Sequence, residues 1–321
     1  MNEITRIELP TQFGMNTVNA YLISGDEQVL IDCGEDTDDS WDTLIHSLSE
    51  KGLLISDLDR VVITHAHVDH IGMARRVAEA TGLQIQVNKP SYDWAINTQS
   101  KWKMRSDLIK TFYEYFMGAE EMKGLAAIFG NLSSQMLAAW KPLEPDMVDT
   151  YDIEGTINFG REKWKILYAP GHTNTQCCFY HGESRRLISA DMLLRITPTP
   201  VMEFKLDEPD VREIGILTML DSYAMFRELD SAMVYPGHYE RFDNPNDIID
   251  RQVHRIHQRK DECLQLIQNG YNTAMKVFQK LYEGRWHGPA INMLVGYLDL
   301  LIHESKIEVE YRDNMTVLKA L

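Results

Sequence analysis

The sequence predicts an α/β fold in which helices cover a β-sheet, followed by a smaller helical unit. Three observations support this prediction. Apolar, β-branched runs alternate with amphipathic helical segments through the first 90 residues. A cluster of His and Asp side chains follows one of these runs at residues 65–70. After Pro245 the apolar residues recur at helical spacing through residue 303.

The first elements follow from turn and cap signals. Two apolar runs at 19–24 and 28–32 flank Gly25-Asp26-Glu27, a composition that favours a hairpin turn. Thr37 is expected to cap a helix over 38–50. Strands and helices in this order are typical of a layered α/β domain with helices outside the sheet.

Four side chains that commonly bind metals follow the apolar run at 60–63. They are His65, His67, Asp69 and His70. A helix is expected over 73–81, so these side chains lie at a strand-to-helix junction. Crowding three imidazoles beside a carboxylate is costly unless a cation pairs them, so a metal site is favoured over a polar surface loop. Such donors suit Zn²⁺ and similar ions, and His65 with His67 could share one ion while Asp69 with His70 share a second.

The motif His-x-His-x-Asp-His after a strand resembles the signature of the metallo-β-lactamase fold superfamily. Later motifs resemble the rest of that signature, in the same order. They are Pro170-Gly171-His172-Thr173, the apolar run ending at Asp191, and Tyr235-Pro236-Gly237-His238. Asp32, at the end of an early strand, resembles the aspartate that supports the ligand loop. The resemblance covers about residues 15–240.

The resemblance implies an αββα sandwich with two divalent metal ions. One ion would be held by His65, His67 and His172 and the other by Asp69, His70 and His238, with Asp191 bridging them. Such a centre hydrolyses esters, thioesters, lactones or β-lactams with a hydroxide shared by the two ions. Asp69 would be the catalytic residue that orients the hydroxide and passes a proton onward. Zn²⁺ is the expected ion, with Fe or Mn as alternatives.

The sequence of residues 91–148 predicts a helical insertion in this domain. Ser106 is expected to cap a helix that ends at 116, and residues 120–129 and 132–140 continue in helical register. The insertion is rich in aromatic and Met side chains. Most of them are expected to form its own core or a homodimer interface, and some to form an apolar wall or lid over the substrate channel.

The sequence predicts further strands and one helix in the second half of this domain. Strands are expected within 157–180, a Pro-rich loop at the rim of the site over 197–209, and a helix over 211–229. His181, at the end of a strand, is expected to be a surface side chain and not a metal ligand.

After Pro245 three helices and a strand pair are expected. They span residues 247–268, 273–282, 290–303, 307–311 and 315–318. This order resembles the winged-helix tail of a glyoxalase-II-like branch of the superfamily. The expected domains are therefore a catalytic unit over 1–244, which includes the insertion, and a winged-helix-like unit over 245–321.

The charge distribution disfavours nucleic acid as a partner. The net charge is −16, and residues 245–321 hold 10 basic and 10 acidic side chains, so the acidic excess lies in residues 1–244. Polyanions are repelled by such a surface, and a small-molecule acyl substrate is the expected partner. A metal-dependent endoribonuclease of the same superfamily is the alternative enzyme. A metal-binding or DNA-associated regulator without turnover is the non-enzymatic alternative.

The residue at position 194 is informative about the class of substrate. Acyl-homoserine lactonases of the superfamily generally carry Tyr three residues after the bridging aspartate, and here Leu194 stands there. This departure disfavours a lactonase within the acyl-substrate class.

The cysteines and the apolar runs predict a cytoplasmic protein without a membrane partner. The four cysteines include the neighbours Cys177 and Cys178 and form no Cys-x-x-Cys pair, so core thiols are expected rather than disulfides. No run of 18 apolar residues and no charged-then-apolar leader occurs.

Overall fold

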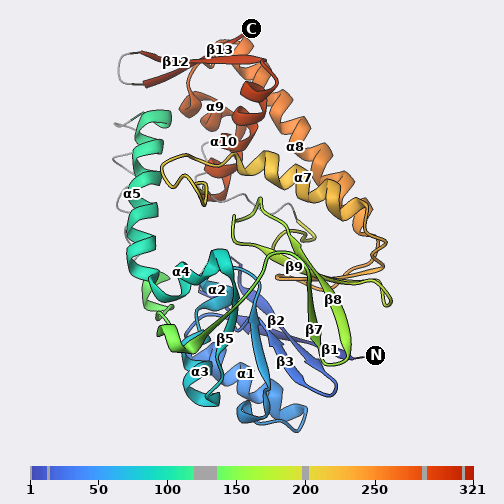
Figure 1. The fold of residues 1–321 in the computed structure, drawn as a ribbon. Helices are drawn as coiled ribbons and strands as arrows, with labels where there is room; N and C mark the ends of the chain where they lie inside the picture. The colour runs from blue at the N-terminus through green and yellow to red at the C-terminus, as the bar shows by residue number, and fades with distance from the viewer. Residues whose placement is uncertain (1, 13–14, 119–135, 197–201, 284–287, 313–314) are drawn as a thin grey trace.

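Two β-sheets pack face to face in the computed structural model, which describes residues 2–12, 15–118, 136–196, 202–283, 288–312 and 315–321 (Figure 1). Within these residues the first sheet has the strand order β1-β2-β3-β4-β5-β6 and the second has the order β11-β10-β9-β8-β7. Helices cover the outer face of each sheet, so the layers run helix, sheet, sheet, helix (Figure 1). The expected αββα fold is confirmed.

The first sheet begins as an antiparallel meander and continues with parallel strands. Its strands are β1 (Glu3–Pro10), β2 (Thr17–Ser24), β3 (Gln28–Ile31), β4 (Arg60–Ile63), β5 (Ile85–Asn88) and β6 (Val148–Tyr151). Crossover helices α1 (Asp38–Glu50), α2 (Val68–Ile71) and α3 (Ala74–Thr81) separate the parallel strands. Thr37 caps α1 as expected, because its Oγ1 accepts a hydrogen bond from the Ser40 backbone N–H at 3.1 Å.

The second sheet is antiparallel except at its β11 edge. Its strands are β7 (Thr156–Phe159), β8 (Glu162–Tyr168), β9 (Cys177–His181), β10 (Arg186–Ala190) and β11 (Met233–Pro236). Buried apolar side chains fill the space between the sheets. They include Tyr21, Ile31 and Val62 of the first sheet and Phe159, Trp164 and Phe179 of the second. This shared core fixes the sheets together, so the strand ends that carry the site cannot slide relative to one another.

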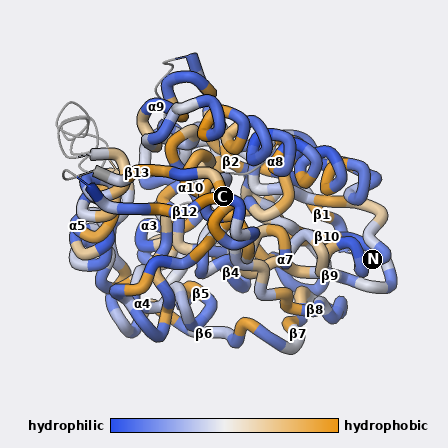
Figure 2. The backbone as a smooth tube through the Cα atoms, turned by 90° about the horizontal axis from the view of Figure 1, so that it is seen from above, coloured by the Kyte–Doolittle hydropathy of each residue, from blue (hydrophilic) through white to orange (hydrophobic). Residues whose placement is uncertain are grey.

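The C-terminal helices share one apolar core with the outer face of the second sheet. The elements are α7 (Gly215–Arg227), α8 (Pro245–Gln268), α9 (Ala274–Leu281), α10 (Gly288–His303), β12 (Ile307–Arg312) and β13 (Met315–Ala320). Leu187 and Phe226 belong to the same cluster as Ile256 and Leu294. Hydrophobic and hydrophilic residues alternate along α8 in Figure 2, as in an amphipathic helix with one buried face. None of the described helices has the length and apolarity that a membrane crossing requires.

The helix α5 (Thr98–Met117) differs from the expectation. Ser106 lies inside this 20-residue helix and does not cap it, so that expected helix start is wrong. The residues before it, including Gln99, Lys101 and Met104, favour helix strongly enough to move the start upstream to Thr98. A short helix, α4 (Tyr92–Ile96), precedes it. The helix expected at 120–129 lies outside the described residues, as do residues 132–135 of the one expected at 132–140, and residues 136–138 of the latter are helical.

Many aromatic side chains of the insertion are part of the protein's own cores. Trp94 and Trp140 are buried in the cluster beneath the first sheet, and Tyr113 and Phe116 are buried in the C-terminal cluster. Helix α5 therefore links two cores, and Figure 1 shows it running from α4 toward the β12–β13 hairpin. The expected lid over a substrate channel stays a prediction.

Two further expectations are corrected. The helix expected from 211 begins at Gly215, because residues 203–213 fold back on themselves and Phe204 pairs with Arg212 in an isolated β-bridge. His181 was expected at the surface, yet it is only 6% exposed. It ends the interior strand β9 and lies beside Trp164 of the neighbouring strand, with ring centroids 5.2 Å apart.

Candidate metal centre

Seven His and Asp side chains gather in two clusters between the sheets. The first cluster is His65, His67 and His172, and the second is Asp69, His70, Asp191 and His238. Within each cluster one ligating atom per residue lies within 4.8 Å of the others. These are all seven side chains that the sequence singled out. They follow strands β4, β8, β10 and β11, whose carboxyl ends bring them to one edge.

The first cluster is three imidazoles that face one another. His67 Nδ1 lies 3.2 Å from His65 Nε2 and 3.0 Å from His172 Nε2. Three neutral ring nitrogens at this spacing suit one tetrahedral cation with an open fourth position.

The second cluster combines imidazoles with carboxylates. His238 Nε2 lies 3.4 Å from Asp69 Oδ2 and 3.2 Å from Asp191 Oδ2, and His70 Nε2 lies 3.4 Å from Asp191 Oδ1. Asp69 and His70 come from the single turn of α2, and the His70 ring lies close to the His65 ring, with centroids 4.1 Å apart.

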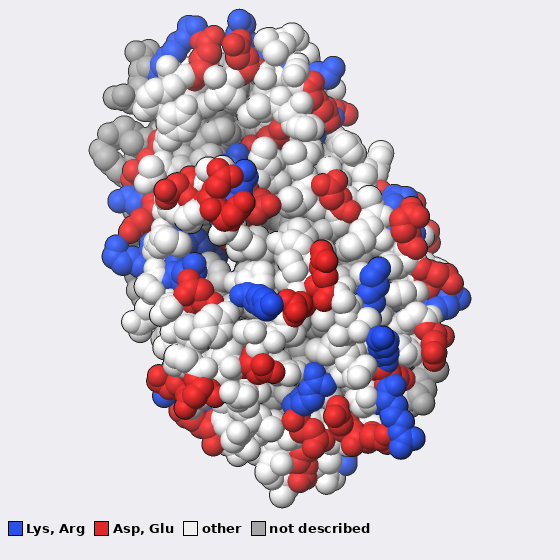
Figure 3. Space-filling model, viewed as in Figure 1, with Lys and Arg blue, Asp and Glu red and all other residues white. Residues whose placement is uncertain are grey.

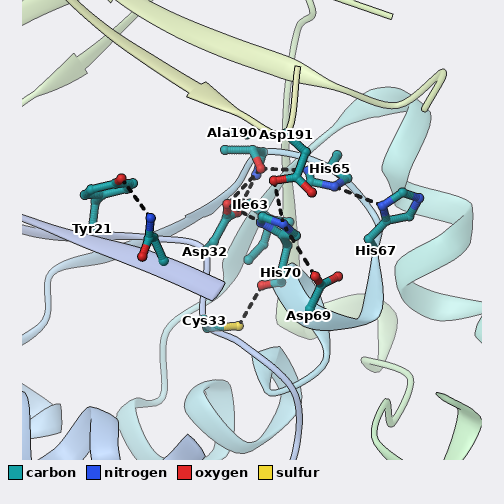
Figure 4. A network of polar contacts seen from close by, with 12 residues as sticks. Tyr21, Asp32, Cys33, Ile63, His65, His67, Asp69, His70, Ala190 and Asp191 are labelled. Carbon is teal, nitrogen blue, oxygen red and sulfur yellow. Dashed lines mark hydrogen bonds and ion pairs between the residues drawn. The ribbon is translucent and has the colours of Figure 1, made fainter. Parts of the chain in front are cut away.

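Asp191 lies between the two clusters. Its Oδ2 is 3.5 Å from His172 Nε2 of the first cluster and 3.2 Å from His238 Nε2 of the second. Figure 4 shows the Asp191 carboxylate directed toward His65 and His70. One carboxylate can therefore contact cations held by both sets of donors.

Hydrogen bonds to the outer ring nitrogens fix which nitrogen faces the centre. His70 Nδ1 donates to Asp32 Oδ2 at 2.8 Å, and His238 Nδ1 donates to the Thr17 carbonyl at 2.6 Å. Thr64 donates its hydroxyl proton to Asp32, so its oxygen is left to accept from His65 Nδ1 at 3.0 Å. In all three rings Nε2 is thereby left as the nitrogen that faces the centre and can bind a metal ion.

Strained backbone accompanies the ligands. Asp32, Ala190 and Tyr239 have positive φ values of 58°, 42° and 66°, and the last two adjoin Asp191 and His238. Non-glycine residues adopt this conformation at an energetic cost, which commonly occurs where a site demands it. A Cβ at Gly237 would overlap Asp191 Oδ1, so only glycine lets the His238 turn approach this carboxylate.

The two clusters differ in charge. Burial and neighbouring imidazoles hold the pKa of His65 and that of His67 well below the usual value. Burial would also lower the pKa of His238, but Asp191 and Asp69 outweigh it and raise this pKa to about 10. Burial disfavours ionised Asp69, yet His70 and His238 lower its pKa to about 2. The first cluster is thus a set of neutral imidazoles, whereas the two carboxylates of the second favour positive charge on the groups beside them.

The donor set fits divalent cations. Two of its buried atoms, His70 Nε2 and Asp191 Oδ1, have no hydrogen-bond partner among the described residues. Leaving such atoms unsatisfied in a buried site is costly, and a cation ligated by both would remove that cost.

The sequence did not reveal the roles of some residues around the site. Thr64 could have been noticed, since it directly precedes His65. The Thr17 carbonyl carried no signal, because it is 221 residues from His238 and contributes only backbone.

A two-sheet sandwich with two facing clusters of His and Asp side chains defines a metal-dependent hydrolase. The chain belongs to the metallo-beta-lactamase superfamily, whose sequence profile matches residues 14–238.

Two curated relatives are similar to this chain. The probable metallo-hydrolase YqjP of Bacillus subtilis is 25% identical over 323 residues, covering 99% of this chain and 98% of that protein. The atrochrysone carboxyl ACP thioesterase of Aspergillus fumigatus is 21% identical over 263 residues, covering 81% of this chain and 62% of that protein.

Solved structures share the fold over nearly the whole chain. A metallo-beta-lactamase family protein from Thermus thermophilus has a TM-score of 0.77 at 19% identity, covering 99% of this chain and 98% of that one. A beta-lactamase domain protein from Burkholderia ambifaria has a TM-score of 0.76 at 18% identity, covering 99% and 92%. The shared fold thus extends through the C-terminal helices.

Proposed function

We propose that this protein hydrolyses a small acyl substrate, a thioester, ester or lactone, at a centre of two divalent cations. The observation that carries the proposal is the position of Asp191 between two complete donor clusters, at 3.5 Å from His172 and 3.2 Å from His238. A metal site with a purely structural role needs only one closed cluster of ligands, so two adjoining clusters favour a catalytic centre.

The ligands divide between the two cations. His65, His67 and His172 would hold one cation and Asp69, His70 and His238 would hold the other, with the Asp191 side chain placed between the two sets. Zn²⁺ fits the imidazole-rich first cluster, with Fe or Mn as alternatives. When bound, a pair of such cations supplies a water of lowered pKa and a Lewis acid for the acyl carbonyl.

The two carboxylates have different tasks. The Asp69 side chain is 16% exposed and that of Asp191 is 5% exposed, so Asp69 is the carboxylate that a substrate and its attacking water can reach. Asp69 Oδ2 orients this water and accepts its proton. Asp191 is buried against His70 and His238 and holds the clusters in register.

An acyl substrate is favoured over RNA by charge and by one relative. The chain carries a net charge of −16. On the face drawn in Figure 3, the described Lys and Arg side chains are scattered among Asp and Glu and form no continuous basic patch. Nucleic-acid affinity depends largely on such cations. The relative from Aspergillus fumigatus is named as a thioesterase, which supports thioester chemistry at this centre.

The C-terminal unit supports a place in the glyoxalase-II-like branch. Helix α8 begins at Pro245, and three helices are followed by the β12–β13 hairpin, the order of elements in a winged helix. The catalytic unit is then residues 1–244, with the insertion at 91–148, and the winged-helix-like unit is residues 245–321.

All four cysteines are unpaired and buried, which is consistent with a cytoplasmic location.

The test compares substrates on one metal-reconstituted preparation. Acyl thioesters, esters and lactones of increasing chain length and a short single-stranded RNA are assayed at physiological salt, with Asp69→Asn as the matched control. Turnover of an acyl substrate that is lost in Asp69→Asn supports the proposal. RNA cleavage that is lost in the same variant, without acyl hydrolysis, identifies a ribonuclease instead. Metal binding without turnover of either class would favour a regulator.

A further inference from the structure

The loop that carries His172 is held on one side by α7. Ser222 Oγ donates a hydrogen bond to the Pro170 carbonyl at 2.6 Å. A Cβ at Gly171 would overlap Met219 Cα, so the loop lies directly against this helix. These contacts fix the base of the loop against α7.

The other side of the loop is held by the segment 202–213. Thr173 Oγ1 donates to Glu203 Oε1 at 3.0 Å, and Asn174 Nδ2 donates to the Phe204 carbonyl at 2.7 Å. Thr173 and Glu203 are 3% and 7% exposed. The residue next to the His172 ligand is therefore bonded to a buried carboxylate that is not itself in either donor cluster.

Glu203 is in turn held by Arg105 of helix α5. Arg105 Nη2 lies 3.4 Å from Glu203 Oε1, and Arg105 Nε donates to the Met202 carbonyl at 3.2 Å. The guanidinium lies over the rings of Trp94 and Trp102, with its Cζ 5.7 and 5.3 Å from their centroids. Burial raises the pKa of Glu203, while Arg105 and Thr173 oppose that shift. The guanidinium therefore positions the carboxyl and favours its ionised form.

Both α5 and the segment 202–213 are anchored to the C-terminal unit. Arg212 makes two hydrogen bonds to the Asp299 carboxylate of α10, at 2.8 and 2.6 Å. Its Cζ also lies 4.7 Å from the ring centroid of Phe112 on α5. Near the end of α5, the rings of Tyr115 and Tyr311 stack with centroids 4.7 Å apart. A chain of contacts thus leads from the C-terminal unit to the loop of a metal ligand.

We propose that Glu203 and Arg105 are positioning residues for His172, so that helix α5 determines how tightly the His65–His67–His172 cluster holds its cation. His172 is the one ligand of this cluster that lies outside the loop at residues 65–70, and a small displacement of its ring opens the cluster. Glu203 prevents that displacement through Thr173, and Arg105 prevents Glu203 from turning away. This inference rests on the metal centre of the proposed function, but not on the identity of its substrate.

The test measures metal affinity rather than turnover. Thr173→Val nearly preserves the side-chain volume but removes the hydroxyl that donates a hydrogen bond to Glu203. Thr173→Ser retains this hydroxyl, and Glu203→Ala removes the carboxylate that accepts the hydrogen bond. Binding of Zn²⁺ is followed by competition with a chromophoric chelator, and Co²⁺ absorption reports the geometry around the ion. Because Thr173→Val is a mild change, it decides the matter even if Glu203→Ala folds poorly.

A second buried Arg–Glu pair provides a matched control. Arg186 and Glu162 have side chains 8% and 10% exposed, against 8% and 9% for Arg105 and Glu203. Arg186 also lies over a tryptophan, with its Cζ 5.2 Å from the Trp164 centroid. Glu162 begins β8 and Arg186 begins β10, whereas the candidate ligands follow the other ends of these strands. Glu162→Ala should therefore reduce stability without changing metal affinity.

The expected result is selective. One of two Zn²⁺ equivalents should bind about 10- to 100-fold more weakly in Thr173→Val and Glu203→Ala, the usual effect of losing a residue that orients a ligand. The other equivalent should be unchanged, and Thr173→Ser should restore wild-type binding and the Co²⁺ spectrum. Equal weakening of both equivalents, or wild-type binding of both by Thr173→Val, would overturn the inference. A wild-type protein that binds fewer than two ions would instead refute the proposed centre itself.

Discussion

Asp32 accepts a hydrogen bond from His70 through a contact of 2.8 Å between Oδ2 and Nδ1, and both side chains are buried. The other oxygen, Oδ1, accepts from the Thr64 backbone N–H at 2.8 Å. One carboxylate thus fixes both the ring of a proposed ligand and the start of the loop that carries three others.

Asp32→Asn should lower metal affinity about 10- to 100-fold, because an amide binds the imidazole N–H more weakly and does not favour the same ring orientation. Chelator competition measures the change. Asp38→Asn is the control, since the Asp38 side chain is 88% exposed. Unchanged affinity in Asp32→Asn would contradict the role given to this carboxylate.

The reconstituted protein should hold close to two divalent cations per chain, because seven donors exceed what one tetrahedral ion uses. Elemental analysis after removal of loosely bound metal provides the count, and chelation should abolish hydrolysis until metal is restored. A reproducible single equivalent would be incompatible with a dinuclear centre.

Asp69→Asn should fold normally and lose about 10²-fold or more in turnover, since an amide is a poorer metal ligand and cannot accept the proton of the attacking water. Steady-state kinetics and thermal unfolding separate the two effects. His46→Ala is the matched control because the His46 side chain is 74% exposed. His181 would be an unsuitable control, since it is buried and its replacement is expected to reduce stability. Equal activity of the Asp69 and His46 variants would remove Asp69 from the mechanism.

Deleting residues 245–321 should leave an insoluble chain or one that melts at lower temperature. Side chains such as Ile256 and Leu294 share a core with Leu187 and Phe226, so the deletion exposes the outer face of the second sheet. Circular dichroism and a melting curve test this. A soluble truncated chain with full activity would mean that the tail is an independent module.

The four thiols should be unreactive in the native protein at about pH 8. Burial raises the pKa of Cys177 and that of Cys263 to about 12, and holds the pKa of Cys33 and of Cys178 well above the usual value. Because a raised pKa keeps the thiol protonated below it, little thiolate is present at this pH. Titration with a disulfide reagent should detect the thiols only after unfolding, and rapid reaction of the folded protein would contradict this.

The sequence by itself determined the candidate donor set and most of the elements that carry it. The candidate ligands follow apolar runs whose composition favours strands, as at β4 before His65 and β10 before Asp191. Caps such as Thr37 act within a few residues, so the beginning of α1 could be predicted from the local sequence.

Only the tertiary structure decided what these elements meet. It brought His172 to His67 and placed Asp191 between the clusters. It also set Glu203 against Thr173 and buried His181 beneath Trp164. The local sequence carries no record of these contacts, because each joins segments whose approach depends on how the two sheets and the C-terminal helices pack. A histidine at the end of a strand is the same in sequence whether the next strand covers it or leaves it in water.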